Sequence, residues 1–328
     1  MSRRVVLVTG GAGYVGSHVC KALDRAGFLP VTYDNLTHGH AWAVKWGPIE
    51  KGCLLDGQLL RDVMRRYRPV AVAHLAGLIA VGESVTNPLI YWRHNVEGSL
   101  SLLAAMHDCG IDRLVFSSTC AIYGAPRLQP IDESAVAAPL SPYAWTKLAV
   151  EQMLRDCAHS HGLKWVALRY FNAAGADPDG DVGEAHAPET HLIPIVLEAA
   201  AGLRPAVTVF GQDYPTPDGT CLRDYVHVSD IADAHLLALD YLDHGHPCRP
   251  FNLGSGTGYS VQQVIATAEK VTGRPVPVIM GQRRPGDPSC LVGQCHDARH
   301  VLGWRPKFAD LSVQIEHAWA WMQSRNKG

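Results

Sequence analysis

The chain has 328 residues, of which 47% are hydrophobic and 18% charged, and its 29 basic and 31 acidic side chains give a formal net charge of -2. This composition predicts a folded core, in one large domain or two intimate ones, and argues against a mostly disordered chain. The near-neutral charge lacks the overall positive field that nucleic-acid binding uses. No apolar stretch approaches the ~18 residues of a membrane span. We therefore expect a cytoplasmic protein without nucleic-acid or membrane partners.

Cysteine and histidine spacing gives no sign of a metal centre. The nine cysteines contain no CxxC pair, and their odd number leaves at least one unpaired, which favours scattered reduced thiols. The 17 histidines contain no HExxH, and His244 and His246, near Cys248, read as a surface loop. We expect no bound metal.

Apolar strands alternate with helical patterns through the first half of the chain. The expected strands are Val5–Thr9, Pro30–Asp34, Val70–His74, Arg113–Ser117 and Lys164–Tyr170. The expected helices are Val15–Ala26, Leu59–Tyr67, Leu89–Asp108 and Tyr143–His161. Continuously apolar strands that alternate with helices indicate a parallel sheet covered on both faces.

The composition changes after Phe171, where the segment Asn172–Pro188 is rich in Gly, Asp and Pro. We therefore expect an α/β protein with a Rossmann-type, doubly wound parallel sheet over residues 1–173. A smaller, loop-rich substrate-binding domain would occupy residues 174–328. The segment 226–250 could return to the first sheet, because Val226–Asp240 again reads as a strand followed by a helix.

A glycine-rich segment, Thr9–Gly16, follows the first strand and opens the first helix. The glycines Gly10, Gly13 and Gly16 would permit a tight turn and close backbone approach to a pyrophosphate at the helix N-terminus. Asp34 ends the second strand, where a carboxylate accepts hydrogen bonds from ribose hydroxyls and repels a 2′-phosphate. The pattern therefore predicts dinucleotide binding, with NAD favoured over NADP.

Tyr143 and Lys147 lie four residues apart after Pro142, so they share one face of a helix. A phenol is a poor base near neutrality, but a neighbouring ammonium and a cationic nicotinamide favour the phenolate. Thr119 follows the fourth strand, where strand ends line the ligand crevice, and could bridge a substrate hydroxyl and Tyr143. These three residues are the catalytic candidates.

Taken together, these segments resemble the extended short-chain dehydrogenase/reductase family, and within it the 4-epimerases of UDP-sugars. The resemblance covers nearly the whole length of the chain. Besides the glycine loop and the Tyr–Lys pair, it rests on His74–Val85, Phe116–Gly124, Arg169–Asn172, Gly180–Glu184, Phe210–His227, Asn252–Gly254 and Arg283–Asp287.

The resemblance implies tightly held NAD, a UDP-sugar substrate and interconversion of UDP-glucose and UDP-galactose through a transient 4-keto sugar. Tyr143 would remove the 4′-hydroxyl proton, directly or through Thr119, and Lys147 would contact the nicotinamide ribose. It further implies a homodimer paired through Leu89–Asp108 and Tyr143–His161, although the apolar positions of these helices could equally pack within one subunit.

The same resemblance assigns the remaining site residues. Those around NAD would be Gly10, Gly13, Tyr14, Val15, Gly16, Asp34, Asn35, Leu36, Thr37, His38, Gly39, Cys53, Leu54, Leu75, Ala76, Gly77, Ile79, His94 and Phe171. Those around the UDP-sugar would be Asn172, His191, Leu192, Thr208, Phe210, Arg223, Tyr225, Arg284, Asp287 and Leu291. Cys53, Ile79 and His94 depart from the family pattern, and the first two remove expected contacts to the cofactor.

Three other functions stay open at this point. A UDP-xylose/UDP-arabinose 4-epimerase needs the same machinery, and Leu291 could leave room for the N-acetyl group of UDP-N-acetylglucosamine. An NAD-binding sensor without catalysis could dispense with the Tyr–Lys pair. Dehydratases and decarboxylases usually carry an acid just after the position of Thr119, where this chain has the neutral Cys120 and Ala121.

Overall fold

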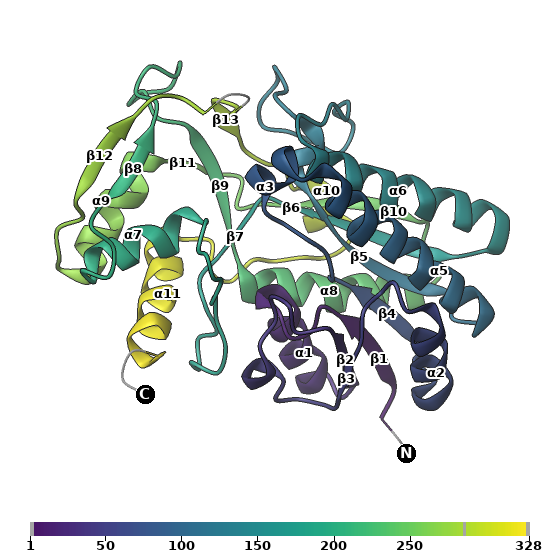
Figure 1. Cartoon of the computed structure of the whole chain (residues 1–328). Helices are drawn as coiled ribbons and strands as arrows, with labels where there is room; N and C mark the ends of the chain where they lie inside the picture. The colour runs from purple at the N-terminus through teal and green to yellow at the C-terminus, as the bar shows by residue number, and fades with distance from the viewer. Residues whose placement is uncertain (1–2, 285–286, 326–328) are drawn as a thin grey trace.

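The computed structural model describes residues 3–284 and 287–325, so two positions of the segment Arg283–Asp287 lie outside it. Its larger sheet has seven strands in the order β10-β6-β5-β4-β1-β2-β3, and all neighbouring pairs are parallel (Figure 1). This sheet confirms the expected α/β fold. The strands are β1 Val5–Thr9, β2 Leu29–Asp34, β3 Ile49–Lys51, β4 Ala71–His74, β5 Arg113–Thr119, β6 Lys164–Tyr170 and β10 Arg249–Leu253.

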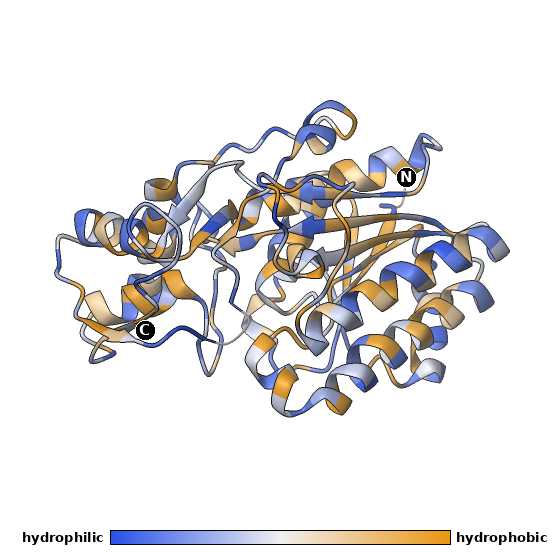
Figure 2. Cartoon of the chain, turned by 90° about the horizontal axis from the view of Figure 1, so that it is seen from above, coloured by the Kyte–Doolittle hydropathy of each residue, from blue (hydrophilic) through white to orange (hydrophobic). Residues whose placement is uncertain are grey.

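Helices cover both faces of this sheet, as the continuously apolar strands require. One face carries α1 (Tyr14–Arg25) and α8 (Val228–Asp243), and the other carries α2 (Gly57–Tyr67), α5 (Gly98–Asp108) and α6 (Pro142–His161). Figure 2 shows the apolar strands between helices whose outer faces are hydrophilic. Within the described ranges, no helix combines the length and apolar character needed to cross a membrane.

Side-chain alternation along β1 explains how one strand serves two cores. Val6 and Val8 belong to the core under α1 and α8, whereas Leu7 belongs to the core under α2, α5 and α6. All three side chains are fully buried. Because successive residues of a strand point to opposite faces, an unbroken apolar run is what a strand covered on both sides needs.

The expected helix over Leu89–Asp108 is present but is not uniform. It consists of α4 (Pro88–Tyr91), the π-helical turn η2 (Trp92–Glu97) and α5, and a short helix α3 (Val81–Thr86) precedes it. A π turn inserts an extra residue and rotates the side chains that follow, and such turns are frequent at functional sites. Periodicity in the sequence did not reveal it. Two short 3₁₀ turns, η1 (Ala41–Ala43) and η3 (Cys120–Tyr123), follow β2 and β5.

The rest of the chain forms two smaller sheets and their helices. Strand β9 (Leu222–His227) pairs with β7 (Asn172–Ala174), β11 (Gly258–Ser260) and β13 (Cys290–Leu291), and β8 (Val207–Phe210) pairs with β12 (Val278–Gly281). The helices α7 (Leu192–Ala200), α9 (Val261–Thr272) and α11 (Leu311–Arg325) contribute to a third core, and α10 (His296–His300) lies near β10. Between these elements, α8 and β10 return to the larger sheet.

The strand order places a crevice beside β1. The chain runs outward from β1 to β2 and β3, and then continues from β4 on the other side of β1. At such a switch point the loops after neighbouring strands lead away in opposite directions, which leaves a ligand crevice at their carboxyl ends. The loops after β1, β4 and β5 carry the predicted glycine loop, Leu75–Gly77 and Thr119.

A buried ion pair joins helix α6 to the middle of the sheet. Arg169 on β6 donates from Nε to Glu151 Oε1 at 2.9 Å and from Nη2 to Oε2 at 2.6 Å. Ser118 on β5 donates to the same carboxylate at 2.7 Å, and Arg169 also donates to Tyr123 Oη at 2.8 Å. Because Glu151 is fully buried, these contacts are what makes its charge tolerable there, and they fix α6 against β5 and β6.

Replacing one member of this pair should destabilise the fold. We expect Glu151→Gln to lower the free energy of unfolding by ~3–5 kcal/mol, because Arg169 would keep a buried charge without its counterion. Urea unfolding followed by circular dichroism measures this loss, with Glu316→Gln on α11 as the matched control. A Glu151→Gln variant as stable as the control would show that the pair does not anchor α6.

Candidate functional site

The glycine loop has the geometry that close approach of a ligand requires. Gly10 has a φ of +73°, and a Cβ there would lie 2.6 Å from the backbone nitrogen of Ala76. A Cβ on Gly16 would lie 2.0 Å from the carbonyl oxygen of Gly10. Gly13 is the N-cap of α1 and offers no side-chain cap, and the first turn of this helix holds no acidic residue. The free N–H groups and the positive end of the helix dipole therefore suit an anionic pyrophosphate.

Asp34 lies at the end of β2 beside the glycine loop. Its Oδ2 accepts a hydrogen bond from Ala12 N at 3.1 Å and its Oδ1 accepts one from Leu36 N at 2.8 Å. Leu36 has a φ of +60°, so the turn after Asp34 is held in the left-handed region. No Lys or Arg pairs with this carboxylate among the residues that the structure describes. The remaining lone pairs and the uncompensated charge suit ribose hydroxyls and disfavour a 2′-phosphate.

Asn95 ties the loop after β4 to α6, and the sequence did not single it out. Its Oδ1 accepts from Leu78 N at 2.8 Å, and its Nδ2 donates to Leu78 O and to Thr146 Oγ1, both at 3.0 Å. A Cβ on Gly77 would lie 3.1 Å from Asn95 Oδ1 and 3.7 Å from Lys147 Nζ. Asn95 thus holds the predicted cofactor segment Leu75–Gly77 against the helix that carries the catalytic candidates. The predicted contact residue His94 is its half-buried neighbour in η2.

The other predicted cofactor residues differ in their exposure. Asn35, Thr37, His38 and Gly39 continue the turn after Asp34, and a Cβ on Gly39 would meet Ala12 Cβ at 2.9 Å. Leu54 and Phe171 are buried, Val15 and Cys53 are half-buried, and Ile79 is 44% exposed. The backbone carbonyl of Cys53 accepts a hydrogen bond of 2.9 Å from the Tyr33 phenol.

The three catalytic candidates meet at the carboxyl end of β5. Thr119 ends this strand, and its side chain interacts with Tyr143 at the start of α6. Lys147 lies one turn further along α6, is only 3% exposed, and donates from Nζ to Ser117 O at 2.9 Å. The ammonium lies 4.9 Å from the centre of the Phe116 ring. It has three donors, so two remain to bind a ligand.

Burial shifts both titrating groups of the pair away from their ordinary behaviour. It raises the pKa of the Tyr143 phenol well above its ordinary value, Tyr170 adds to the rise, and the Thr119 side chain opposes it. Burial lowers the pKa of Lys147 to about 8. The phenol is therefore neutral in the protein alone, and the lysine is still largely protonated near pH 7. Because of these two pKa shifts, the charge of a bound ligand would change the ionisation of Tyr143 and Lys147.

The predicted substrate residues form two pairs. Arg223 on β9 makes an ion pair with Asp287, and Arg223 Nη1 donates to Leu222 O at 2.8 Å. The guanidinium of Arg284 lies 4.1 Å from the centre of the Phe210 ring. Arg223 opposes the burial that raises the pKa of the Cys120 thiol. This side chain of the smaller sheets therefore lies near the carboxyl end of β5.

Asp224 fixes the position of Arg223 and was missed from the sequence. Its Oδ1 accepts from Ser255 N and Oγ, both at 2.7 Å, and its Oδ2 accepts from Gly256 N and Gly293 N, both at 3.1 Å. Burial raises the pKa of this carboxyl, against the effect of these hydrogen bonds. The side chain joins β9 to the loop after β10 and to the residues after β13. Asp224 lies within Phe210–His227, one of the segments that carry the family resemblance. Its neighbours in the sequence do not mark it as a buried hydrogen-bond acceptor.

The remaining predicted substrate residues occupy nearby strands and one helix start. Asn172 Nδ2 donates to Asp224 O at 2.8 Å, and Tyr225 and Leu291 are buried, Leu291 beside Arg223 in the strand register. Thr208 is exposed and shares a strand face with Phe210. His191 is the N-cap of α7, Leu192 is its first residue, and His191 Nδ1 lies 2.7 Å from Glu184 Oε1.

Comparison with known proteins agrees with this geometry. The model of the NAD dependent epimerase/dehydratase family matches residues 6–254. The UDP-glucose 4-epimerase of Rhizobium meliloti (strain 1021) is 50% identical over 328 residues and is covered over 100% of both chains. The crystal structure of UDP-glucose 4-epimerase from Brucella ovis in complex with NAD has a TM-score of 0.95 and 48% identity, and covers 97% of this chain and 98% of that one.

A third relative has a sugar nucleotide bound. UDP-glucose-4-epimerase from Stenotrophomonas maltophila, with bound NAD and formylated UDP-arabinopyranose, has a TM-score of 0.96 and 39% identity, with 99% of both chains covered. The family match spans the glycine loop, the Tyr–Lys pair and β10, and the relatives extend over the substrate residues as well. The chain therefore belongs to the NAD-dependent epimerase/dehydratase family.

Proposed function

We propose that this protein is an isomerase that interconverts UDP-glucose and UDP-galactose at carbon 4 of the hexose, with NAD as its tightly held cofactor. The observation that carries the proposal is the meeting of Thr119, Tyr143 and Lys147 at the strand end beside the glycine loop. The relatives named above, with their printed activity and bound NAD, support the same conclusion.

Side chains of the protein transfer the 4′-hydroxyl proton and provide the positive charge beside the phenol. When bound, NAD⁺ would supply the acceptor for the hydride of carbon 4, and its positive charge would favour ionisation of a nearby phenol. Tyr143 takes the proton of the 4′-hydroxyl, directly or through Thr119, and later returns it. Lys147 uses its free donors to hold the nicotinamide ribose and keeps a positive charge near the phenol.

The UDP part of the substrate is held while the sugar ring turns over. Arg223 and Arg284 neutralise the diphosphate, a task for which the guanidinium fork is suited. Asn172 contacts the phosphates or the sugar, Asp287 binds the uridine ribose and Phe210 lies near the uracil. Arg223 and Asp287 form an ion pair with each other. A nucleotide that binds there replaces this ion pair with its own contacts to the two side chains.

The neutral residues after Thr119 favour epimerisation over elimination or decarboxylation. Cys120 is buried with a pKa raised by burial to about 12, so it offers no acid or thiolate for those reactions. The identity of the sugar is tested directly by incubating the purified protein with UDP-glucose, UDP-N-acetylglucosamine and UDP-xylose without added NAD. Product identification by NMR separates the proposed activity from the two related epimerase activities, and a sensor gives no product.

We also propose that two copies pair through α4, η2, α5 and α6. Apolar side chains are exposed along this face, among them Leu89 at 82%, Leu100 at 57%, Trp145 at 48% and Trp92 at 40%. A contiguous exposed apolar surface of this kind is typical of an interface between proteins.

Placing a charge on this face should separate the pair. We expect Leu100→Glu to shift the protein from dimer to monomer, because an unpaired carboxylate would be buried in the interface. Light scattering after size-exclusion chromatography gives the mass. The control is Leu203→Glu, an equally exposed leucine in the smaller domain. A monomeric wild-type protein would contradict the proposed dimer.

Removing the phenol oxygen should abolish most turnover without weakening binding. We expect Tyr143→Phe to lower kcat by ~10²–10⁴-fold, the usual contribution of a general base, with little change in the Kd for UDP-glucose. Tyr241→Phe is the matched control. Tyr241 lies on α8, away from the proposed catalytic residues, and its phenol donates to Pro247 O at 3.0 Å. An unchanged kcat in Tyr143→Phe would remove this residue as the base.

The carboxylate at the end of β2 should set cofactor choice. We expect the wild-type protein to bind NAD more tightly than NADP, and Asp34→Asn to weaken NAD binding by about tenfold, since hydrogen bonds to a charged acceptor are lost. Fluorescence titration of protein stripped of nucleotide measures both constants, with Asp24→Asn on α1 as control. Tighter binding of NADP by the wild-type protein would contradict this role.

A further inference from the structure

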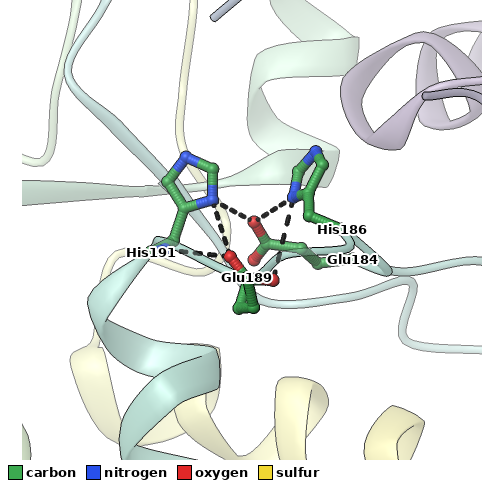
Figure 3. Close-up of side chains that lie close together, drawn as sticks. All are labelled: Glu184, His186, Glu189 and His191. Carbon is green, nitrogen blue, oxygen red and sulfur yellow. Dashed lines mark hydrogen bonds and ion pairs between the residues drawn. The ribbon is translucent and has the colours of Figure 1, made fainter. Parts of the chain in front are cut away.

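Four side chains of the loop between β7 and α7 converge on one point outside the proposed catalytic residues. Glu184, His186, Glu189 and His191 each offer one ligand atom, and these four atoms lie within 4.8 Å of one another. Figure 3 shows that both imidazoles direct Nδ1 toward the two carboxylates, while their other ring nitrogens point away. Sequence spacing did not predict this convergence, because the segment 184–191 contains neither a CxxC nor an HExxH pattern.

The separations between these atoms are near those around a tetrahedral ion. His191 Nδ1 lies 2.7 Å from Glu184 Oε1 and 3.1 Å from Glu189 Oε1. His186 Nδ1 lies 3.0 Å from Glu184 Oε1 and 3.8 Å from Glu189 Oε2. Around tetrahedral Zn²⁺, with bonds of about 2.0–2.2 Å, ligand atoms lie about 3.3–3.6 Å apart, so the tightest pair, His191 and Glu184, would open by roughly 0.6–0.9 Å to admit the ion.

The charges of the cluster also call for a cation. The Glu184 and Glu189 side chains are only 7% and 6% exposed, and each has the two imidazoles as its ion-pair partners. No Lys or Arg pairs with either carboxylate in the described ranges. Two buried negative charges are therefore balanced either by two imidazolium ions or by one dication with neutral imidazoles.

Two titratable side chains of α1 lie near the cluster. The Tyr14 ring lies edge-on to that of His186, with ring centres 6.3 Å apart, and the His18 ring lies edge-on to that of Tyr14 at 5.4 Å. Burial lowers the pKa of His18 to about 4, so neither side chain supplies a positive charge to the two carboxylates near pH 7.

Surrounding hydrogen bonds hold the ligands in place. Glu189 Oε1 accepts from the backbone N–H groups of Thr190 and His191 at 2.7 and 2.8 Å. Trp321 Nε1 donates to Glu184 O at 2.9 Å, and a hydrogen bond of 2.7 Å joins His40 Nε2 to Ala185 O. Such outer contacts orient ligands before an ion arrives, which is a usual requirement of a metal site.

A second acidic cluster in the same region already has a positively charged side chain as its partner. The carboxylates of Asp177, Asp179 and Asp181 all lie within 2.8 Å of Lys21 Nζ. An ammonium thus already fills the position that a cation would take. The Glu–His cluster has no such side chain among its described neighbours.

We propose that Glu184, His186, Glu189 and His191 form a structural Zn²⁺ site that fixes the loop 184–191. Four protein ligands close the tetrahedron, so the ion holds no open position for catalysis. Two imidazoles and two carboxylates, with no thiolate, suit Zn²⁺ among divalent ions. This proposal departs from our expectation of no bound metal, and it does not depend on the proposed epimerase activity.

The site would link the two ligand-binding regions. His186 lies edge-on to Tyr14 of the glycine loop, with ring centres 6.3 Å apart, and shares a small cavity with Gly13 and Tyr14. His191 begins α7 and is a predicted substrate residue. An ion bound by His186 and His191 would fix the loop that packs against Tyr14 and leads into α7.

Zinc titration of the untagged full-length protein tests the proposal. After dialysis against a chelator, we expect one Zn²⁺ per chain to bind at pH 7.5. Isothermal titration calorimetry gives the number of ions bound and the Kd. Zinc should also raise the Tm, and the chelator should reverse the increase.

Variants distinguish this cluster from adventitious binding by other histidines. We expect His186→Ala and Glu189→Gln each to weaken zinc binding at least roughly 100-fold and to abolish the zinc-dependent rise in Tm. The control is the double variant His296→Ala/His300→Ala, which removes another close histidine pair, with ring centres 4.3 Å apart, and should bind zinc as the wild type does.

Two results would overturn the proposal. One is a wild-type protein that binds no zinc, since the cluster would then consist of imidazole–carboxylate contacts alone. The other is loss of binding in the His296/His300 control with retention in Glu189→Gln. Because the wild-type titration needs no variant to fold, the test stands even if His186→Ala is unstable.

Discussion

The ion pair between Glu151 and Arg169 is the contact on which the arrangement of the proposed catalytic residues depends. It fastens α6 to β5 and β6 from within the protein, where both charges are removed from water. Tyr143 and Lys147 lie on the preceding turns of the same helix, and Thr119 ends the strand against which that helix packs. The distance between the phenol and the strand end is therefore set by an interaction two to three turns away.

A second polar contact does the same for the proposed substrate residues. Asp224 collects hydrogen bonds from the loop after β10 and from the residues after β13, and so holds β9 at the edge of the larger sheet. Its neighbour Arg223 is thereby brought into the electrostatic environment of Cys120, next to Thr119. The two regions are joined by buried hydrogen bonds rather than by apolar packing alone, which favours one fixed arrangement over several.

Burial sets the ionisation of the proposed catalytic pair, Tyr143 and Lys147. A phenol with a raised pKa is inert as a base until a positive charge is close, and a lysine with a pKa of about 8 loses part of its charge above that value. A bound cationic ring would favour ionisation of the phenol, which links proton removal to occupation of the cofactor site. The Glu–His cluster in the loop 184–191 lies beside the glycine loop, where His186 contacts Tyr14.

The sequence by itself determined the parallel sheet, its helices and the glycine loop, and it brought Tyr143, Lys147 and Thr119 together as candidates. Those features are encoded locally, in apolar runs, in glycine spacing and in residues four apart on one helix. Only the tertiary structure decided that Asn95 rather than His94 carries the hydrogen bonds to Leu78, because a π turn changes the side-chain phase of the helix. It alone also showed the pairing of Arg223 with Asp287, the acceptor role of Asp224 and the convergence of Glu184, His186, Glu189 and His191. These contacts join side chains whose meeting depends on how loops and strands pack, and spacing along a chain carries no information about that packing.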